Sequence, residues 1–197
     1  MNWVTLRSSL FLMISLLMAQ SAWAEAYRHS ATGIVFPDRI ATLEKRAEAT
    51  DYETKSPGLG VSVAYDGPGI TVTVSVYTMN MKFIPTGLNS LVLRDNFSQA
   101  VWDIERMGEL GRYSDVKRIS DGEVSWDASG KGVTSHHAFY SYWQNGRDRL
   151  SHLYLMGFRN HFFKIRFTYD EDRQKYAERI RSEMLLEFSR ILSCLEN

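Results

Sequence analysis

Histidines, tyrosines and basic residues alternate with apolar residues between positions 136 and 167, and these side chains are suited to recognising a ligand or a partner. Seven of them are predicted to share one face of a sheet: His136, Tyr140, Tyr142, His152, Tyr154, Lys164 and Arg166. A fold about Arg159 sets Tyr154 opposite Lys164. The same fold sets His152 opposite Arg166, so this face would be both aromatic and basic.

Two readings of this aromatic and basic face stay open. An open face could bind an anionic or peptide partner, because each side chain combines apolar area with a polar tip. In the other reading a helix covers the face, and only the polar tips reach the rim.

The histidines give no metal site. His136 and His137 are adjacent on a predicted strand, so they point to opposite faces and cannot readily share an ion. His152 and His161 add no Cys, no His-x-x-x-His pair and no Asp-rich loop that would complete a ligand set. We therefore predict no metal and no cofactor.

Catalytic signatures are missing as well. The chain has no Gly-x-Ser-x-Gly elbow, and the single cysteine, Cys194, falls at the edge of an apolar helical stripe, where we expect a packed and inert thiol. We therefore assign no catalytic residue. An unrecognised envelope hydrolase stays an alternative, because active sites assemble from residues far apart in the sequence.

The first 24 residues have the pattern of a cleaved signal peptide. Arg7 precedes an apolar run, and Ala22-Trp23-Ala24 fits a cleavage site before Glu25. We predict a single α+β domain over residues 25–197, soluble in the periplasm and without stable membrane insertion after cleavage. Because Arg7 is the only charged residue removed, the mature chain is nearly neutral. A neutral chain has no bulk field for nucleic acid, which we exclude as a partner.

The elements that position these residues follow from periodicity. Apolar residues alternate over 59–65 and again over 70–76, which predicts a central hairpin with Tyr65 opposite Ile70 and Val63 opposite Val72. Helical spacing predicts a helix from Asn89 or Ser90 to Gly108 and a last helix from about 172. Three strands near 136–169, a second hairpin over 116–126 and a short helical turn within 38–48 complete the expectation. This order favours an antiparallel sheet with helices packed on both faces.

Three stretches, 33–37, 57–65 and 151–169, resemble a group of uncharacterised exported bacterial proteins, and the element order is similar to the PsbP-like fold. The resemblance implies an α/β/α sandwich around an antiparallel sheet. It also implies an accessory or interaction role and brings no catalytic motif. We accordingly expect a periplasmic accessory or binding protein that acts on another protein or on a cell-envelope component. An immunity-type protein that neutralises a periplasmic toxin is the alternative.

Overall fold

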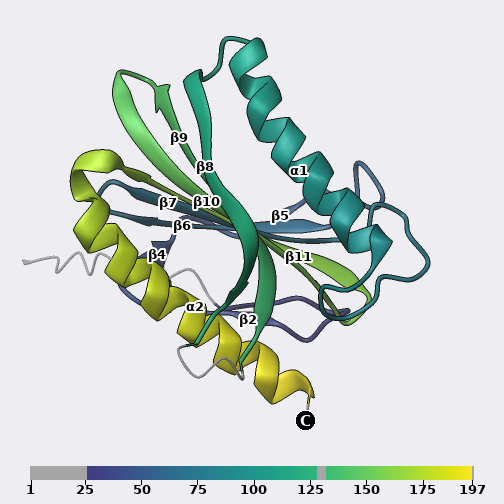
Figure 1. The fold of residues 1–197 in the computed structure, drawn as a ribbon. Helices are drawn as coiled ribbons and strands as arrows, with labels where there is room; N and C mark the ends of the chain where they lie inside the picture. The colour runs from purple at the N-terminus through teal and green to yellow at the C-terminus, as the bar shows by residue number, and fades with distance from the viewer. Residues whose placement is uncertain (1–25, 128–131, 197) are drawn as a thin grey trace, which may run out of the picture.

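The computed structural model describes residues 26–127 and 132–196, and within these residues the main feature is a nine-stranded antiparallel sheet (Figure 1). Its strands are β3 (Arg39–Ile40), β4 (Leu43–Lys45), β5 (Thr50–Asp51), β6 (Val61–Gly67), β7 (Ile70–Tyr77), β8 (Ser114–Ser125), β9 (Thr134–Gln144), β10 (Arg147–Phe158) and β11 (His161–Asp170). Their order across the sheet is β3-β4-β6-β7-β11-β10-β9-β8, with β5 beside β6. A separate pair, β1 (Tyr27–Arg28) and β2 (Val35–Phe36), precedes it.

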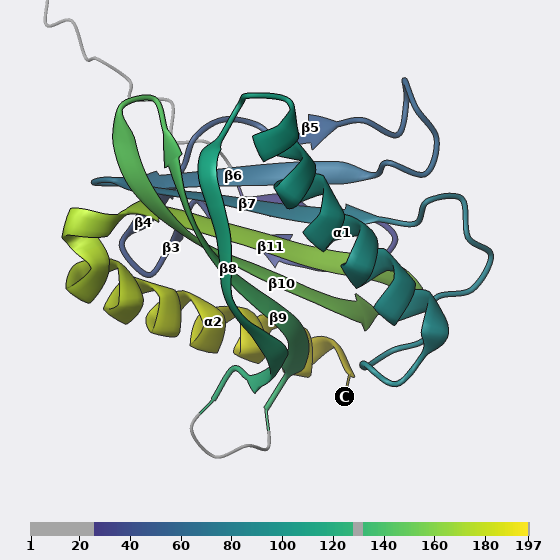
Figure 2. The same ribbon diagram turned by 45° about the horizontal axis from the view of Figure 1, so that its top comes forward.

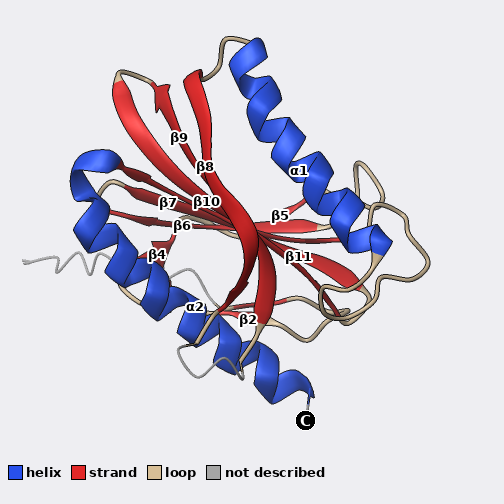
Figure 3. Cartoon of the chain, in the orientation of Figure 1, coloured by secondary structure: helices blue, strands red, loops and turns tan. Residues whose placement is uncertain are grey.

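Two α-helices accompany the sheet in the described part of the chain (Figure 3). Helix α1 (Leu91–Glu109) begins after Ser90, whose Oγ accepts a hydrogen bond from the Leu93 amide at 3.2 Å, as an N-cap does. Helix α2 (Gln174–Glu196) follows the 3-10 turn η1 (Glu171–Arg173). Both helices lie where the apolar spacing predicts them.

The two helices lie over different parts of the sheet (Figure 2). Side chains of α1 pack with Ala138, Tyr140 and Leu153. Side chains of α2 pack with Tyr154 and Ile165. Leu153 and Tyr154 are neighbours on β10 and point to opposite sides, so we call these sides the α1 face and the α2 face. The expected antiparallel sheet with helices is confirmed, and neither face has a full helical layer within the described residues.

The central hairpin forms with a shorter turn than the sequence suggests. Gly67 pairs with Ile70, which leaves Pro68 and Gly69 as the turn, and Gly69 takes a φ of 71°. The predicted pairing of Val63 with Val72 is therefore wrong by two residues, since Val63 lies opposite Val74. A shift of two keeps the same face, so the buried valines are those expected.

The pairing register of β10 with β11 differs from the prediction by one residue, and this difference changes which side chains share a face. Arg159 and Asn160 both have positive φ, 45° and 62°, which makes them the two-residue turn with Phe158 opposite His161. The predicted fold about Arg159 alone is wrong, because a shift of one residue moves every side chain of one strand to the other face. Tyr154 consequently lies opposite Ile165 and not opposite Lys164.

Two further expectations are wrong. The segment 38–48 has no helical turn: it is a strand hairpin in which Ile40 pairs with Leu43, both fully buried, around Ala41 at a φ of 51°. The segment 116–126 is no hairpin either. Residues 116–125 belong to the continuous edge strand β8, in which Asp121 and Gly122 pair with Ala138 and His137 of β9. The two irregularities of this pairing lie before Asp121.

The ends of the chain complete the description. The predicted signal peptide, residues 1–24, lies outside the described residues. None of the described helices is both long and apolar enough to cross a membrane. Cys194, expected to be packed, is exposed near the end of α2.

Candidate functional site

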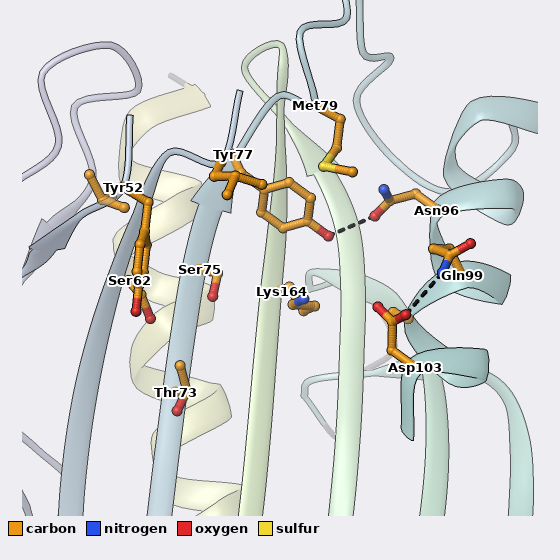
Figure 4. A pocket seen from close by; sticks show the side chains of 13 residues that line it. Tyr52, Ser62, Thr73, Ser75, Tyr77, Met79, Asn96, Gln99, Asp103 and Lys164 are labelled. Atoms are coloured by element: carbon orange, nitrogen blue, oxygen red, sulfur yellow. Dashed lines mark hydrogen bonds between the residues drawn. The ribbon is translucent and has the colours of Figure 1, made fainter. Parts of the chain in front are cut away.

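A groove of about 420 Å³ lies between α1 and the part of the sheet formed by β6, β7 and β11 (Figure 4). This volume is in the range of about 300–1,000 Å³ typical of ligand pockets. Its lining includes Ser62, Thr73, Ser75 and Lys164 from the strands, with Asp103 from α1. An adjoining cavity of about 330 Å³ shares Thr73, Ser75, Asp103 and Lys164 with it. The groove exists because α1 packs over β9 and β10 and leaves this part of its own face uncovered.

Strand pairing places the groove's polar side chains in a row. Ser62 lies opposite Ser75, and Ser75 lies opposite Lys164, so one line of side chains crosses three strands. Directly opposed residues on one face have Cβ atoms about 5 Å apart. Thr73 lies opposite Arg166 one step along the sheet. The result is a hydroxyl-rich floor that ends at a lysine.

Lys164 has an ammonium group without an acceptor in the described residues. Its Nζ lies 5.1 Å from the centre of the Tyr77 ring, and no carboxylate in the described ranges forms an ion pair with it. Burial lowers the pKa of Lys164, Asp103 opposes that shift, and Arg166 adds to it. Asp103 instead accepts a hydrogen bond from Gln99 at 2.9 Å. A partly buried cation in this state favours an anionic ligand.

Arg166 is held more firmly than Lys164. Its Nε donates to Ser151 Oγ at 2.6 Å, and its guanidinium reaches the Tyr142 hydroxyl at 3.4 Å. Arg166 therefore adds positive charge beside the groove, while its guanidinium is held in place by Ser151 and Tyr142.

The seven side chains predicted to share one face are divided between two. His136, Tyr140, Tyr142, Lys164 and Arg166 lie on the α1 face, whereas His152 and Tyr154 lie on the α2 face. The cause is the pair of two-residue turns at Asn145-Gly146 and Arg159-Asn160, which set Tyr154 opposite His137 on β9 and opposite Ile165 on β11.

Helix α1 covers part of the predicted face. Tyr140 is fully buried, Tyr142 nearly so, and His136 stacks against Phe97 of α1 with ring centres 5.1 Å apart. Only Lys164 of the seven lines the main groove, and Arg166 lines the adjoining cavity. A partner-binding role for the whole set stays a prediction.

His152 and Tyr154 belong instead to a buried polar network on the α2 face. His152 Nδ1 lies 2.9 Å from His137 Nε2, and His152 Nε2 lies 2.9 Å from Glu178 Oε1. Burial lowers the pKa of His137 to about 4 and lowers that of His152 as well, so both rings are neutral at pH 7. His152 then donates to Glu178 and accepts from His137.

Glu178 is the centre of this network. Tyr169 donates to its Oε1 at 2.6 Å, and Arg181 donates to its Oε2 at 2.6 Å and to the Tyr154 hydroxyl at 2.7 Å. Burial raises the pKa of Glu178, but the hydrogen bonds from His152 and Tyr169 and the charge of Arg181 outweigh it and bring the pKa to about 2. Such a satisfied network fixes the packing of α2 on the sheet.

The remaining histidines are dispersed. His136 and His137 lie on opposite faces, and His161 packs edge-on against His29 with ring centres 5.2 Å apart. Among the described residues, no group of three or more His, Cys, Asp or Glu side chains is placed to hold a metal ion.

The prediction missed most of the groove. Ser62, Thr73, Ser75 and Asp103 were outside the predicted face. The available signal was the polar half of the alternation in β7, where threonine and serine alternate with buried valine.

Comparisons with known proteins support the fold. No family model matches the chain, and no curated protein matches it by sequence. The solved structure of cyanobacterial PsbP (CyanoP) from Synechocystis aligns with a TM-score of 0.51 at 13% identity, over 81% of this chain and 87% of that chain. The chain has the PsbP-like fold. The predicted resemblance is therefore confirmed, and at this identity it concerns the fold alone.

Two other solved structures align less well. PA94, a protein of unknown function from Pseudomonas aeruginosa, gives a TM-score of 0.38 at 14% identity over 78% of this chain and 87% of that chain. LpqN, involved in cell envelope biogenesis of Mycobacterium tuberculosis, gives a TM-score of 0.32 at 12% identity over 81% of this chain and 85% of that chain. The fold assignment rests on CyanoP.

Proposed function

We propose that this chain is a non-catalytic binding protein of the bacterial periplasm, and that it engages a partner protein or an envelope component through the groove beside α1. The observation that carries the proposal is the row of Ser62, Ser75 and Lys164. Within the described residues these side chains hydrogen bond to nothing, although they line a groove of ligand size. Ligand pockets carry a few polar groups that fix the orientation of the ligand, and these hydroxyls and this ammonium are available for that role.

The surroundings of the groove support this role. Tyr52, Leu59 and Met79 line it and are large apolar side chains that stay about half exposed. An apolar rim around a small polar centre is typical of surfaces that bind another molecule. The signal-like pattern of residues 1–24 supports export.

Affinity capture with a groove variant tests the proposal. The mature protein, immobilised and exposed to periplasmic extract, should retain a component that Lys164→Glu does not retain, because the reversal changes the charge at the groove floor. The control is Lys175→Glu, the same reversal at an exposed position on α2. If wild type and Lys164→Glu retain the same components in equal amounts, the groove is not the binding site.

Export is tested separately by fractionation. We expect the mature protein in the soluble periplasmic fraction with Glu25 as its first residue. Recovery with the inner membrane and an intact first segment would identify the apolar run as an anchor and overturn this part of the proposal.

A further inference from the structure

We propose that the groove binds a single-chain amphiphile with a carboxylate headgroup, which lies on Lys164 while its apolar chain extends toward Tyr52, Leu59 and Met79. This inference rests on the proposed function and names the ligand class for the same groove. The argument has three parts: the headgroup site, the chain site and the charge beside them.

The headgroup site has the donors that a carboxylate requires. Lys164 supplies an ammonium with no acceptor in the described residues, and Ser75 lies directly opposite it on the neighbouring strand. The hydroxyls of Ser62 and Thr73 flank Ser75 and also hydrogen bond to no other described residue. One cation and several hydroxyl donors match a group that carries one negative charge and two acceptor oxygens. Figure 4 shows Lys164 between the side chains of β7 and those of α1.

The chain site is an apolar surface that the protein holds in place. Leu59 is 46% exposed, yet its loop is fixed, because Glu53 accepts hydrogen bonds from the Gly58 and Gly60 amides at 2.9 and 2.8 Å. Gly60 has a φ of 61°, and a Cβ there would lie 1.9 Å from Val76 O, so the loop sits directly on β7. Exposure of Leu59 is thus a property of the fold. An alkyl chain laid on such a surface gains free energy in proportion to the apolar area it covers.

Asp103 is the carboxylate that works against an anion in this groove. It is exposed on α1 and its charge influences Lys164, but it hydrogen bonds to Gln99. Arg166 lies on the same face two residues along β11 from Lys164, lines the adjoining cavity and contributes positive charge there. The two cations outnumber the single carboxylate, so the local field favours an anionic headgroup. Asp103→Asn should therefore tighten binding.

Calorimetric titration of the mature protein with dodecanoate tests the proposal, with dodecyltrimethylammonium and acetate as reference probes. Dodecanoate should bind, the cationic amphiphile with the same chain should bind at least about tenfold more weakly, and acetate should give no measurable binding. Lys164→Met should weaken dodecanoate about tenfold or more, and Leu59→Asp should weaken it without any change at Lys164. Lys175→Met is the matched control and should bind as wild type does. Asp103→Asn should raise the affinity.

The outcomes separate this inference from the function on which it rests. Equal affinity of wild type and Lys164→Met for dodecanoate, or equal affinity of wild type for the two amphiphiles, would overturn the headgroup assignment. No binding of dodecanoate would overturn the ligand class. In either case, a periplasmic component captured by wild type and lost in Lys164→Glu would leave the proposed function standing. Unchanged unfolding midpoints for Lys164→Met and Leu59→Asp show that their weaker binding is local.

Discussion

Glu178→Gln tests whether the buried network on the α2 face stabilises the fold. The side chain of Glu178 accepts hydrogen bonds from His152, Tyr169 and Arg181. Each bond to a charged group contributes about 1.5–3 kcal/mol. Glu178 is 31% exposed and glutamine keeps one acceptor oxygen. We therefore expect the free energy of unfolding to fall by about 3 kcal/mol rather than by the sum over all three bonds. In a domain of this size that lowers the midpoint of thermal unfolding by about 6–12 °C.

The pH dependence of this loss identifies its cause. The folded-state pKa of Glu178 is lowered from 4.5 to about 2, so its stabilising contribution is fully present above pH 4.5 and is lost as the pH falls toward 2. The difference between wild type and Glu178→Gln should therefore be large at pH 7 and should shrink over that interval. Urea unfolding followed by tryptophan fluorescence, to which Trp126 buried against Tyr154 contributes, measures the difference in stability at each pH.

The matched control is Glu183→Gln on the same helix. Glu183 also bonds an arginine, Arg179, at 2.9 Å, but both side chains are more than 40% exposed. Exposed pairs contribute about 0.2–1 kcal/mol, so this variant should stay close to wild type. If Glu178→Gln unfolds at the wild-type midpoint at pH 7, or keeps its deficit at pH 2, the network does not act as argued.

Three further predictions concern stability. Val74→Ala should cost about 1–3 kcal/mol in urea unfolding, because Val74 is fully buried in the central hairpin, and an unchanged midpoint would show the hairpin to be peripheral. Tyr140→Ala and Tyr154→Ala should each cost about 3–5 kcal/mol by the same assay, since both rings are fully buried on opposite faces; wild-type stability of the double variant would contradict the described packing. Burial lowers the pKa of His29 and of His137 to about 4, so the unfolded chain binds more protons below pH 6.5, and stability should fall from pH 6.5 to 4; a flat profile would refute this.

The fold was predictable where periodicity is strong. The valines of β6 and β7 specify one buried face, and Ser90 supplies the cap that starts α1, so these elements lie where expected. The hairpin at Ile40 and Leu43 could not be predicted in this way, because two buried residues three positions apart suit a helical turn as well as a two-residue turn between strands. The positive φ of Ala41 distinguishes the strand turn from the helical turn, and an alanine in the sequence does not indicate a positive φ.

The candidate site was less predictable because it depends on a turn. Arg159 and Asn160 both adopt positive φ, a conformation typical of Asn-Gly pairs and unexpected for arginine. The resulting shift of one residue leaves Lys164 and Arg166 on the α1 face and moves His152 and Tyr154 to the other. Together with the turn at Asn145-Gly146, which sets Tyr154 opposite His137, this shift separates the predicted set into residues of the α1 face and residues of the buried network on the α2 face.

The two sides of β7 show why a groove forms where it does. The α2 side carries Val72 and Val74, which are fully buried, whereas the α1 side carries Thr73 and Ser75, which are partly exposed. Strands covered by helices on both sides are apolar on both sides, so the hydroxyls of β7 indicate a side that none of the described elements covers completely. Lys164 lies opposite Ser75 and Arg166 opposite Thr73. Arg166 donates to Ser151, whereas Lys164 is largely buried and its ammonium has no acceptor among the described residues. Burying a cation without a partner costs free energy, and a site that binds an anion recovers that cost when the ligand arrives.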